Sequence, residues 1–482
     1  MSVLACALGG CATIEAPVRA PVTLPDAFLL APVPQDEPLD LRALLPVSDA
    51  AFVKLNQAAM AGAPTLEAAL ARIELARAEL AAARAGQRPD IRASGAITGR
   101  RIGAQQIGSL PSGVPLDREN VLFQTGIEAS YDTDLFGGLR ASARAAQARL
   151  SAAGADARAV RLALTGDIAT GVIAWRALAE QLIVAEGDLE QANALVDITA
   201  ERVRVGVASD TDRVRAASLA ADALTRIEAI GGERAQVLGQ LVTLTALPAQ
   251  QVLPVLQTAA PDPALRPVDA AVPMDILRNR PDVQAAEARL RAADAEIAAA
   301  AAARFPRLTL SALAGLAALT AGDLFGSDAI TGSVGPTLAG PLFDFGRVAA
   351  RIDASEAQAR EAFARYRRSV FVGLGEAETA FGQITSADRQ VAQLTRQVAL
   401  DEDAAMLVAI RYRNGVESFV GVAEARRQAF AARQRLADAK ARARTTRVAL
   451  FRALGGAEDM SDRQRAPGAS DAADPSRQGE TP

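Results

Sequence analysis

Histidine is absent from the sequence, and its 482 residues include only two cysteines, one tryptophan and three tyrosines. Because histidine is the commonest general base and the commonest metal ligand, its absence excludes catalytic triads and histidine-based metal sites. The motifs GxSxG, GxGxxG after a strand and the P-loop are missing as well. We predict no catalytic residues, no cofactor and no metal site. An enzyme that uses only Asp, Glu, Lys or Ser stays as the weakest alternative.

An excess of positive charge is also lacking, since the net charge is −4 and the sequence pI is about 5.4. Nucleic-acid binding needs a broad surface of Lys and Arg to neutralise phosphates, so we expect no nucleic-acid partner. Small apolar residues are abundant instead, in alanine runs such as residues 298–303. Small side chains let helices approach closely, and the composition therefore favours tightly packed helices.

Both cysteines, Cys6 and Cys11, lie close to the N-terminus. Leu8-Gly9-Gly10-Cys11 resembles a bacterial lipobox, in which the leader is removed and the new N-terminal cysteine is acylated. The leader, residues 1–10, is short and has no Lys or Arg, so we interpret it as an incomplete lipoprotein signal peptide. We predict lipid attachment at Cys11, the alternative being a plain hydrophobic N-terminus. Ala12, rather than Asp, after the cysteine implies export to the outer membrane.

Two segments are predicted to lie outside the folded repeats. Residues 11–60 are interpreted as a lipid anchor and an extended tether, because six prolines between Glu15 and Asp40 disfavour a helix. Residues 457–482, rich in Asp, Arg, Ser and Pro, are predicted to be disordered. We find no later run of 18 or more apolar residues and expect no transmembrane helix.

The remainder of the chain contains one unit twice. Pro64-Thr-Leu-Glu-Ala-Ala-Leu-Ala-Arg72 matches Pro281-Asp-Val-Gln-Ala-Ala-Glu-Ala-Arg289, and Arg204-Val-Gly206 matches Arg413-Asn-Gly415. Because a repeat dictates architecture, we predict a first repeat at 61–260 and a second at 261–456. Each repeat is predicted to run helix, strand, strand, long helix, turn, helix.

The long helices are predicted at about 139–205 and 347–413, each roughly 100 Å long. Two shorter helices laid end to end would match each of them, at 64–86 with 209–247 and at 281–304 with 418–454. These lengths predict a long α-helical barrel of coiled-coil hairpins. An ordinary soluble coiled coil is the alternative.

Four segments, 91–99, 121–132, 308–314 and 333–342, alternate apolar and polar residues and have the length of tilted membrane-spanning strands. A soluble sheet packed on a helix shows the same alternation. Four strands alone would leave two open edges, which hydrocarbon does not tolerate. The predicted fold class is therefore mainly α with a small transmembrane β part, in which a homotrimer shares a 12-stranded barrel. Its lumen is predicted to be lined by Arg92, Ser94, Gln124 and Glu128.

Several motifs resemble the TolC-like outer-membrane efflux proteins, in the lipoprotein branch that serves resistance-nodulation-division pumps. The resemblance covers about residues 41–456, although Tyr131-Asp-Thr stands where that family often has a tryptophan. It implies an outer-membrane channel, set in lipid, that passively conducts small molecules from an inner-membrane efflux pump and a periplasmic adaptor protein to the exterior. The motifs are Asn279-Arg-Pro-Asp-Val-Gln-Ala-Ala-Glu287, Arg304-Phe-Pro-Arg-Leu-Thr-Leu310, Asp134-Leu-Phe-Gly137 and Pro341-Leu-Phe-Asp-Phe-Gly-Arg347.

The two helical hairpin turns are the strongest functional candidates. Gly206 and Gly415 can adopt the left-handed conformation that ends a helix. The resemblance implies that these turns form the periplasmic mouth and meet the adaptor, and neighbouring charges could gate it, although charges beside a turn are often only solvated. The predicted tip and gate residues are Arg204, Gly206, Asp210, Asp212, Arg411, Tyr412, Gly415 and Glu417.

Two further functions are weighed against the efflux channel. A duct for type I protein secretion would use the same fold. A soluble helical scaffold would have its strands covered by its own helices.

Overall fold

The computed structural model describes residues 22–25, 27–31, 35–38, 40–101, 119–259, 268, 270–271 and 274–456. The predicted lipid attachment at Cys11 and the predicted tail at 457–482 lie outside the described residues. The chain divides into two compact units. The first contains Ala68–Ala157 and Asp282–Ser369, and the second contains Leu24–Glu67, Arg158–Pro281 and the chain from Val370 onwards.

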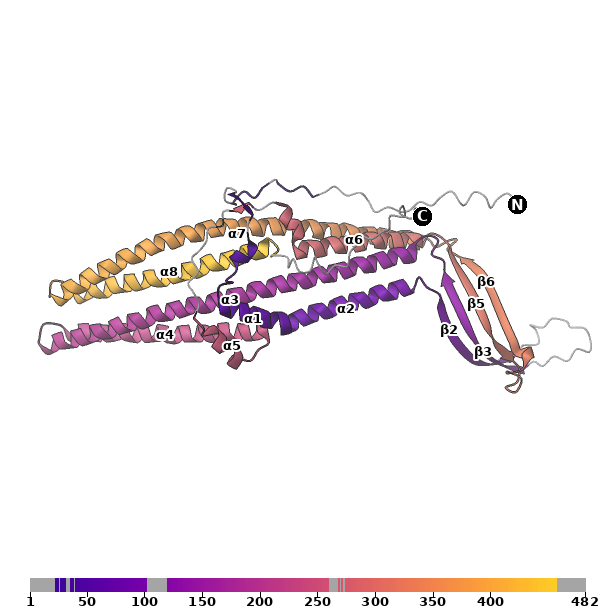
Figure 1. The fold of residues 1–482 in the computed structure, drawn as a ribbon, viewed down its shortest axis with the longest axis horizontal. Coiled ribbons are helices and arrows are strands. Elements are labelled where there is room, and N and C mark those ends of the chain that lie inside the picture. Colours follow the sequence, from indigo (N-terminus) through magenta and orange to yellow (C-terminus); the bar gives the residue numbers. More distant parts are fainter. Residues whose placement is uncertain are drawn as a thin grey trace, which may run out of the picture. The chain divides into compact units, whose positions relative to one another are not determined.

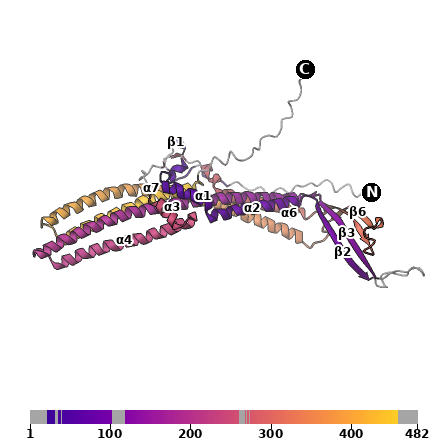
Figure 2. The same ribbon diagram turned by 60° about the horizontal axis from the view of Figure 1, so that its bottom comes forward.

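The first unit is organised around a four-stranded antiparallel sheet with the order β2-β3-β5-β6, which leaves β2 and β6 at its edges. Figures 1 and 2 show the four strands side by side, with the helices of this unit continuing from one end of the sheet and covering neither of its faces. The strands are β2 (Asp90–Arg101), β3 (Glu119–Asp132), β5 (Arg307–Ala318) and β6 (Ile330–Ala339), and the helices wholly or mostly in this unit are α2 (Pro64–Ala85) and α6 (Pro281–Ala302).

The register preserves the alternation of side chains across all four strands. Ile91 lies opposite Ala129, which lies opposite Ala312, which lies opposite Val334. Because successive residues of a strand point to opposite faces, one face is therefore mainly apolar, the exceptions being Thr125, Tyr131 and the Arg101–Glu119 ion pair at its end. It is also uncovered, since Ile97 is 71% exposed and Val334 87% exposed. The other large exposed side chains of this face are Ile91, Val121, Ile127, Leu310, Ile330 and Leu338.

The third and fourth strands differ most from their predicted bounds: β5 continues to Ala318 beyond the predicted 308–314, and β6 begins at Ile330, before the predicted start. The sequence placed the fourth strand at 333–342, whereas β6 ends at Ala339 and Leu342 lies beyond it, 90% exposed. A Cβ on Gly340 would come within 2.6 Å of Pro306 Cα, so the chains converge there too closely for a regular ladder. Pro341 follows and cannot donate a ladder hydrogen bond, so the strand ends before it.

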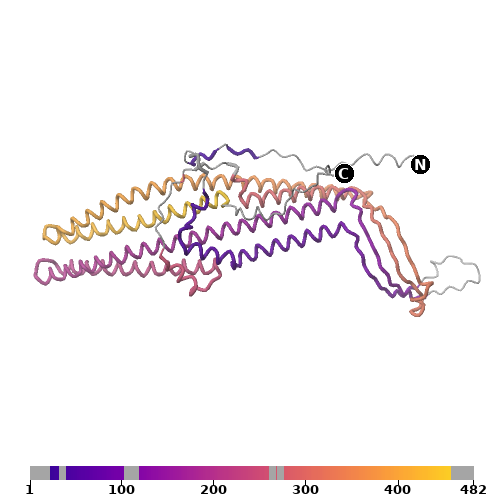
Figure 3. The backbone as a smooth tube through the Cα atoms, in the orientation of Figure 1, coloured from indigo at the N-terminus to yellow at the C-terminus, as the bar shows by residue number. Residues whose placement is uncertain are grey.

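The predicted long helices are confirmed at α3 (Gly138–Arg204) and α7 (Arg347–Arg413), each of 67 residues, and both contribute residues to the two units. In the second unit α4 (Asp210–Thr245) runs beside α3 and α8 (Phe419–Ala453) beside α7 (Figure 3). The helix predicted at 209–247 ends earlier, because Ala246 takes a left-handed φ of 54° and Pro248 follows. A separate helix, α5 (Ala249–Leu256), continues the chain.

The tether predicted for residues 11–60 is not extended throughout. The 3-10 helix η1 (Leu41–Leu44) and helix α1 (Ala50–Gly62) lie within it, and β1 (Gln35–Pro38) pairs in parallel with β4 (Ala270–Ala271). Helix α1 forms because Asp49 caps it, accepting a hydrogen bond from the Ala51 N–H at 2.9 Å, and because its apolar residues recur at helical spacing.

The core of the second unit holds α1 in place. Phe52 and Leu55 are buried in one hydrophobic cluster with Trp175 and Val172 of α3. At its edge Arg176 donates to the Asp49 carboxylate, with Nε 2.9 Å from Oδ2, and to the Leu256 carbonyl at 2.8 Å. The Asp49 carboxylate thus accepts hydrogen bonds both from the first turn of α1 and from Arg176 of α3.

Part of α3 corrects the expectation that no helix could span a membrane. Among the described helices it contains a stretch that is long and apolar enough by length and composition, half of which is buried within the chain. The buried α3 side chains Leu164, Ile168 and Val172 belong to the cluster that packs on α1. The apolar character of this stretch is therefore used in helix packing.

A close contact between the two central strands gives a test of the sheet. Gly126 lies opposite Gly315, and a Cβ on Gly315 would stand 2.4 Å from the Thr125 carbonyl oxygen. We expect Gly315→Ala to lower the free energy of unfolding by about 1–3 kcal/mol through overpacking. The measurement is denaturant or thermal unfolding of the purified protein in detergent. Gly335→Ala on the same face of β6, where nothing lies within 4 Å of an added Cβ, is the control. Equal stability of the two variants would contradict the prediction.

Candidate channel wall and hairpin tips

The four residues predicted to line a lumen share the polar face of the sheet. Arg92 lies directly opposite Glu128, and the position of Gln124 lies opposite Ala96, which is on the same face as Arg92 and Ser94. Continuing across the sheet, Glu128 lies opposite Leu313 and this residue opposite Ser333. The other polar side chains on this face are Asp90, Thr98, Arg100, Asn120, Ser130, Asp132, Arg307, Thr309, Ser311, Thr331 and Thr337.

The ion pairing on this face is local. Arg92 Nη2 lies 2.6 Å from Asp90 Oδ2, two residues away on the same strand, and both side chains are largely exposed. An exposed ion pair contributes little to stability, so this pair does not explain why charges occupy a strand. A face in contact with water explains them, because charges that stay hydrated have no desolvation penalty.

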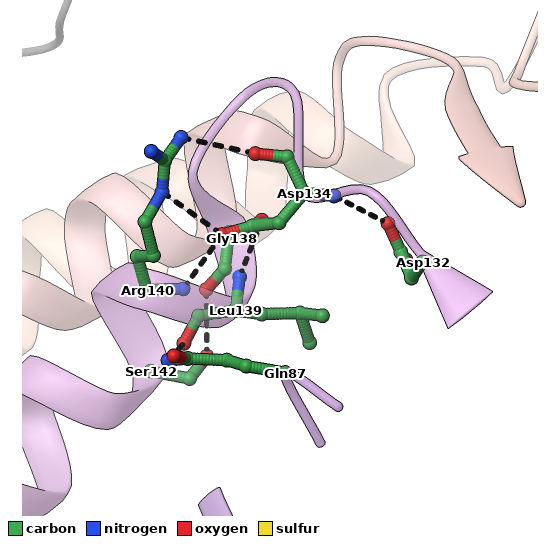
Figure 4. A network of polar contacts seen from close by, with 7 residues as sticks. All are labelled: Gln87, Asp132, Asp134, Gly138, Leu139, Arg140 and Ser142. Carbon is green, nitrogen blue, oxygen red and sulfur yellow. Dashed lines mark hydrogen bonds and ion pairs between the residues drawn. The ribbon is translucent and has the colours of Figure 1, made fainter. Parts of the chain in front are cut away.

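Each strand pair connects to a long helix through an aspartate that caps the helix. At the first junction, shown in Figure 4, Asp134 has a φ of 48° and its carboxylate accepts hydrogen bonds from the N–H groups of Leu139 at 2.8 Å and Arg140 at 2.9 Å. The Arg140 guanidinium folds back to the same carboxylate, with Nε 3.2 Å from Oδ2. The Asp132 side chain in turn accepts from the Asp134 N–H at 2.9 Å.

The second junction repeats the device. Asp344 accepts from the N–H groups of Val348 at 2.9 Å and Gly346 at 3.1 Å. The hydrogen bond from Val348 is the largest cause that lowers the pKa of the Asp344 carboxyl, so the cap stays ionised near neutral pH. Gly137 and Gly346, with φ of 74° and 86°, provide the left-handed turn at the two junctions. The sequence motifs Asp134-Leu-Phe-Gly137 and Pro341-Leu-Phe-Asp-Phe-Gly-Arg347 contain both junctions, but the caps were not predicted; their signal is an Asp shortly before each helix.

The two hairpin tips have the same backbone geometry, as their glycines predicted. Gly206 has a φ of 80° and its N–H donates to the Val203 carbonyl at 3.0 Å, while the Val207 N–H donates to the Arg202 carbonyl at 2.9 Å. Gly415, with a φ of 78°, makes the equivalent bonds of 2.9 and 3.0 Å. This pair of bonds is the Schellman motif, which satisfies the last carbonyls of a helix and needs glycine at its left-handed position.

The predicted gate charges are paired within their own hairpins. Each pair joins residues three to six positions apart, so none of these three pairs connects one repeat to the other. The pairs are Arg204 with Glu201 at 2.8 Å, Asp210 with Arg213 at 2.6 Å and Arg411 with Glu417 at 3.6 Å. Asp212 lies in the first turn of α4, where a negative charge complements the helix dipole.

Two of these pairs stabilise the charged form of their carboxylates. A hydrogen bond from Arg213 lowers the pKa of Asp210, and one from Arg204 lowers the pKa of Glu201. A lowered pKa means that each carboxylate remains ionised down to a more acidic pH than a free one. The Glu201–Arg204 and Asp210–Arg213 pairs therefore stay charged across the neutral range.

Tyr412 differs from the other predicted tip residues because it is buried. Its side chain is 4% exposed and packs in a cluster with Leu195 of α3 and Phe419 of α8. The Arg202 guanidinium lies 4.6 Å from the centre of its ring and donates to the Tyr412 carbonyl at 2.8 Å. The structure thus places Tyr412 in the packing between the two hairpins and not on a solvent-facing gate.

A sheet with one wet face, one uncovered apolar face and two open edges, joined to long helical hairpins, defines the class of outer-membrane channel proteins. The outer membrane efflux protein family matches residues 55–247 and 272–456, which is more than half of the chain. The chain belongs to this family. The predicted fold class and the predicted function, an outer-membrane component of an efflux system, are thereby confirmed.

Individual relatives cover most of the chain. The pyoverdine export outer membrane protein OpmQ of Pseudomonas putida is 31% identical over 395 residues, covering 81% of this chain and 83% of that protein. The toluene efflux pump outer membrane protein TtgI of the same species is 30% identical over 413 residues, covering 86% and 87%.

Solved structures show the same fold. The outer-membrane channel OprN superposes with a TM-score of 0.83 at 27% identity, covering 92% of this chain and 99% of that one. A membrane protein from Pseudomonas aeruginosa has a TM-score of 0.83 at 26% identity, covering 92% of this chain and all of that one.

Proposed function

We propose that three copies of this chain close one barrel and form a passive duct, which conducts small molecules from an inner-membrane pump and a periplasmic adaptor to the exterior without catalysing a reaction. The observation that carries the proposal is the uncovered apolar face of a sheet whose edge strands, β2 and β6, each have one partner among the described residues. Exposed apolar surface of this extent is unfavourable in water and favourable against lipid.

The strand order supports closure by copies of the same chain. All three strand pairs are antiparallel, so β6 runs opposite to β2, and β6 of one copy can pair with β2 of the next in the same antiparallel sense. Closure satisfies every edge backbone group, which hydrocarbon requires. Three copies supply twelve strands, and the polar face with Arg92, Ser94, Gln124 and Glu128 then lines the lumen.

The relatives support small organic cargo over protein cargo, since their names specify pyoverdine and toluene. The alternative of a soluble scaffold required strands covered by the chain's own helices, and in the described residues the apolar face is uncovered.

The hairpin tips suit a contact with the adaptor because apolar side chains project beside each glycine, with Val207 63% and Val416 64% exposed.

The two faces of β6 provide the test of this arrangement. Val334 lies on the apolar face and the adjacent Ser333 on the polar face. We expect Val334→Arg to make the free energy of assembly in the membrane less favourable by about 2–4 kcal/mol, because it places a charge against lipid. Ser333→Arg should be tolerated, because its side chain faces the lumen. The measurement is the yield of outer-membrane protein and its mass in detergent by light scattering. Equal tolerance of the two variants, or a stable monomer for the natural sequence, would overturn the proposal.

The gate role of the tip charges is tested by conductance in planar bilayers. Asp210→Ala and Glu417→Ala each remove one member of an ion pair beside a tip. If these charges hold the mouth closed across the trimer axis, both variants should raise the conductance of the closed state. Glu424→Ala, which removes a comparable local pair with Arg427 on α8, is the control and should leave it unchanged. Unchanged conductance for both tip variants would remove these residues as gate residues.

Lipid attachment at Cys11 is a separate proposal, supported by the lipobox-like Leu8-Gly9-Gly10-Cys11 and by the outer-membrane family. We expect Cys11→Ser to abolish incorporation of labelled palmitate in bacterial cells, and Cys6→Ser to leave it intact because Cys6 departs with the leader. Palmitate retained by the Cys11→Ser variant would show that this cysteine is not the acylated residue.

A further inference from the structure

A cavity of about 500 Å³ lies in the first unit where the sheet joins its helices. Its wall is made from the end of β3, the start of β5, the first turns of α3, the end of α6 and one face of α7. The two strands involved are the central strands of the sheet and not its edges. A single copy of the chain therefore builds the cavity without a contribution from a neighbouring strand.

The cavity borders the polar face of the sheet. Its lining includes Asp132 and Arg307, and the register places both on the face that carries Arg92 and Glu128. The α7 side chains that line it, Arg351, Ser355 and Gln358, recur at the spacing of one helix face. In the proposed duct the cavity is thus a recess of the lumen wall just beyond the membrane-spanning strands.

The charges of the cavity are unequally compensated. Two of its carboxylates have cationic partners, since Asp134 pairs with Arg140 and Glu296 pairs with Arg149. The two lining guanidiniums, Arg307 and Arg351, are exposed and make no ion pair or side-chain hydrogen bond within the described part of the chain. Asp132 alone remains to offset them, and its carboxylate already accepts the Asp134 N–H. The recess is consequently suited to an anion.

An aromatic surface borders the same recess. The rings of Phe136 and Phe305 stack with their centres 4.4 Å apart and their planes 12° from parallel, and both residues line the cavity. Phe136 is 46% exposed, so part of its ring is accessible from the recess. Small side chains of α6, among them Ala299 and Ala300, complete this part of the wall.

We propose that this recess binds small organic anions that carry an aromatic ring, with the carboxylate on the guanidiniums of Arg307 and Arg351 and the ring against Phe136 and Phe305. Guanidinium groups bind carboxylates through paired charge-assisted hydrogen bonds. The role of the recess as a station on the export route rests on the proposed duct. Such a station has to bind weakly, since conduction requires that a ligand can both enter and leave.

Benzoate is the probe that tests the site, and its binding to the detergent-purified full-length protein is measured by saturation-transfer NMR with a titration. We expect Arg351→Gln and Arg307→Gln each to raise the dissociation constant about tenfold, because each removes a charge-assisted hydrogen bond. Arg351→Lys keeps the charge but loses the planar fork, so it should bind benzoate more weakly than the natural sequence and more tightly than Arg351→Gln. Benzyl alcohol, with the ring but no charge, and acetate, with the charge but no ring, should both bind the natural sequence more weakly than benzoate.

Arg360→Gln is the matched control. Arg360 is on the same helix, pairs with Glu356 and lies nine residues beyond Arg351, which places it on the opposite side of α7. Benzoate binding should be unchanged in this variant. Equal affinities of the Arg360→Gln and Arg351→Gln variants, or equal binding of benzoate and benzyl alcohol, would overturn the site.

The same protein inserted in planar bilayers separates this inference from the duct itself. A conducting pore whose benzoate binding does not depend on Arg307 or Arg351 contradicts the site and leaves the duct standing. Arginine-dependent benzoate binding by a protein that forms no pore contradicts the duct and supports the site.

Discussion

The backbone hydrogen bonds along the two edges of the sheet are the constraint on which the rest of the structure depends. β2 and β6 are the edge strands, and each has a strand partner on one side only among the described residues. The apolar face between them is uncovered in the same part of the chain. In hydrocarbon an unpaired N–H or C=O group costs several kcal/mol, whereas in water the apolar face itself is unfavourable. One copy of the chain cannot satisfy both demands. Pairing with further copies satisfies both, and the antiparallel strand order makes such pairing regular.

The two repeats begin and end their long helices with the same residue types. An aspartate caps each long helix where a strand ends, at Asp134 and at Asp344, and a glycine follows it in the left-handed region. At the far end of each long helix Gly206 and Gly415 close the same Schellman motif. Helices of this length have exposed termini with unsatisfied backbone groups, and these caps satisfy them without tertiary help. The duplicated sequence therefore produces duplicated junctions and tips.

Three sets of charged residues differ in what surrounds them. Asp49 and Arg176 are bonded to each other and to backbone in the core of the second unit, where they orient α1. The tip charges are paired within their own hairpins and remain exposed, so their contribution to stability is small. Arg307 and Arg351, in the recess beside the sheet, have no anionic partner in the described part of the chain, and the proposed ligand would supply one.

Much of this fold could be predicted from the sequence because its signals are local and periodic. The alternation of Ile91, Ala93 and Ile97 with Arg92 and Ser94 identified a two-faced strand, and the long helical periods placed α3 and α7 within one residue of their observed bounds. The sequence did not predict helix α1, whose cap and core partner Trp175 lie far apart along the chain.

The sequence by itself determined which residues alternate, where the helices turn and that an enzyme of the histidine-dependent kinds was excluded, since these follow from side-chain chemistry and short-range backbone preferences. Tertiary structure alone decided the register that sets Arg92 opposite Glu128 and the burial of Tyr412 between the hairpins. It also decided the partners of the tip charges and the recess that joins Arg307 to Arg351. Those depend on which distant segments pack together, and side-chain contacts across such distances have no signature in a single sequence.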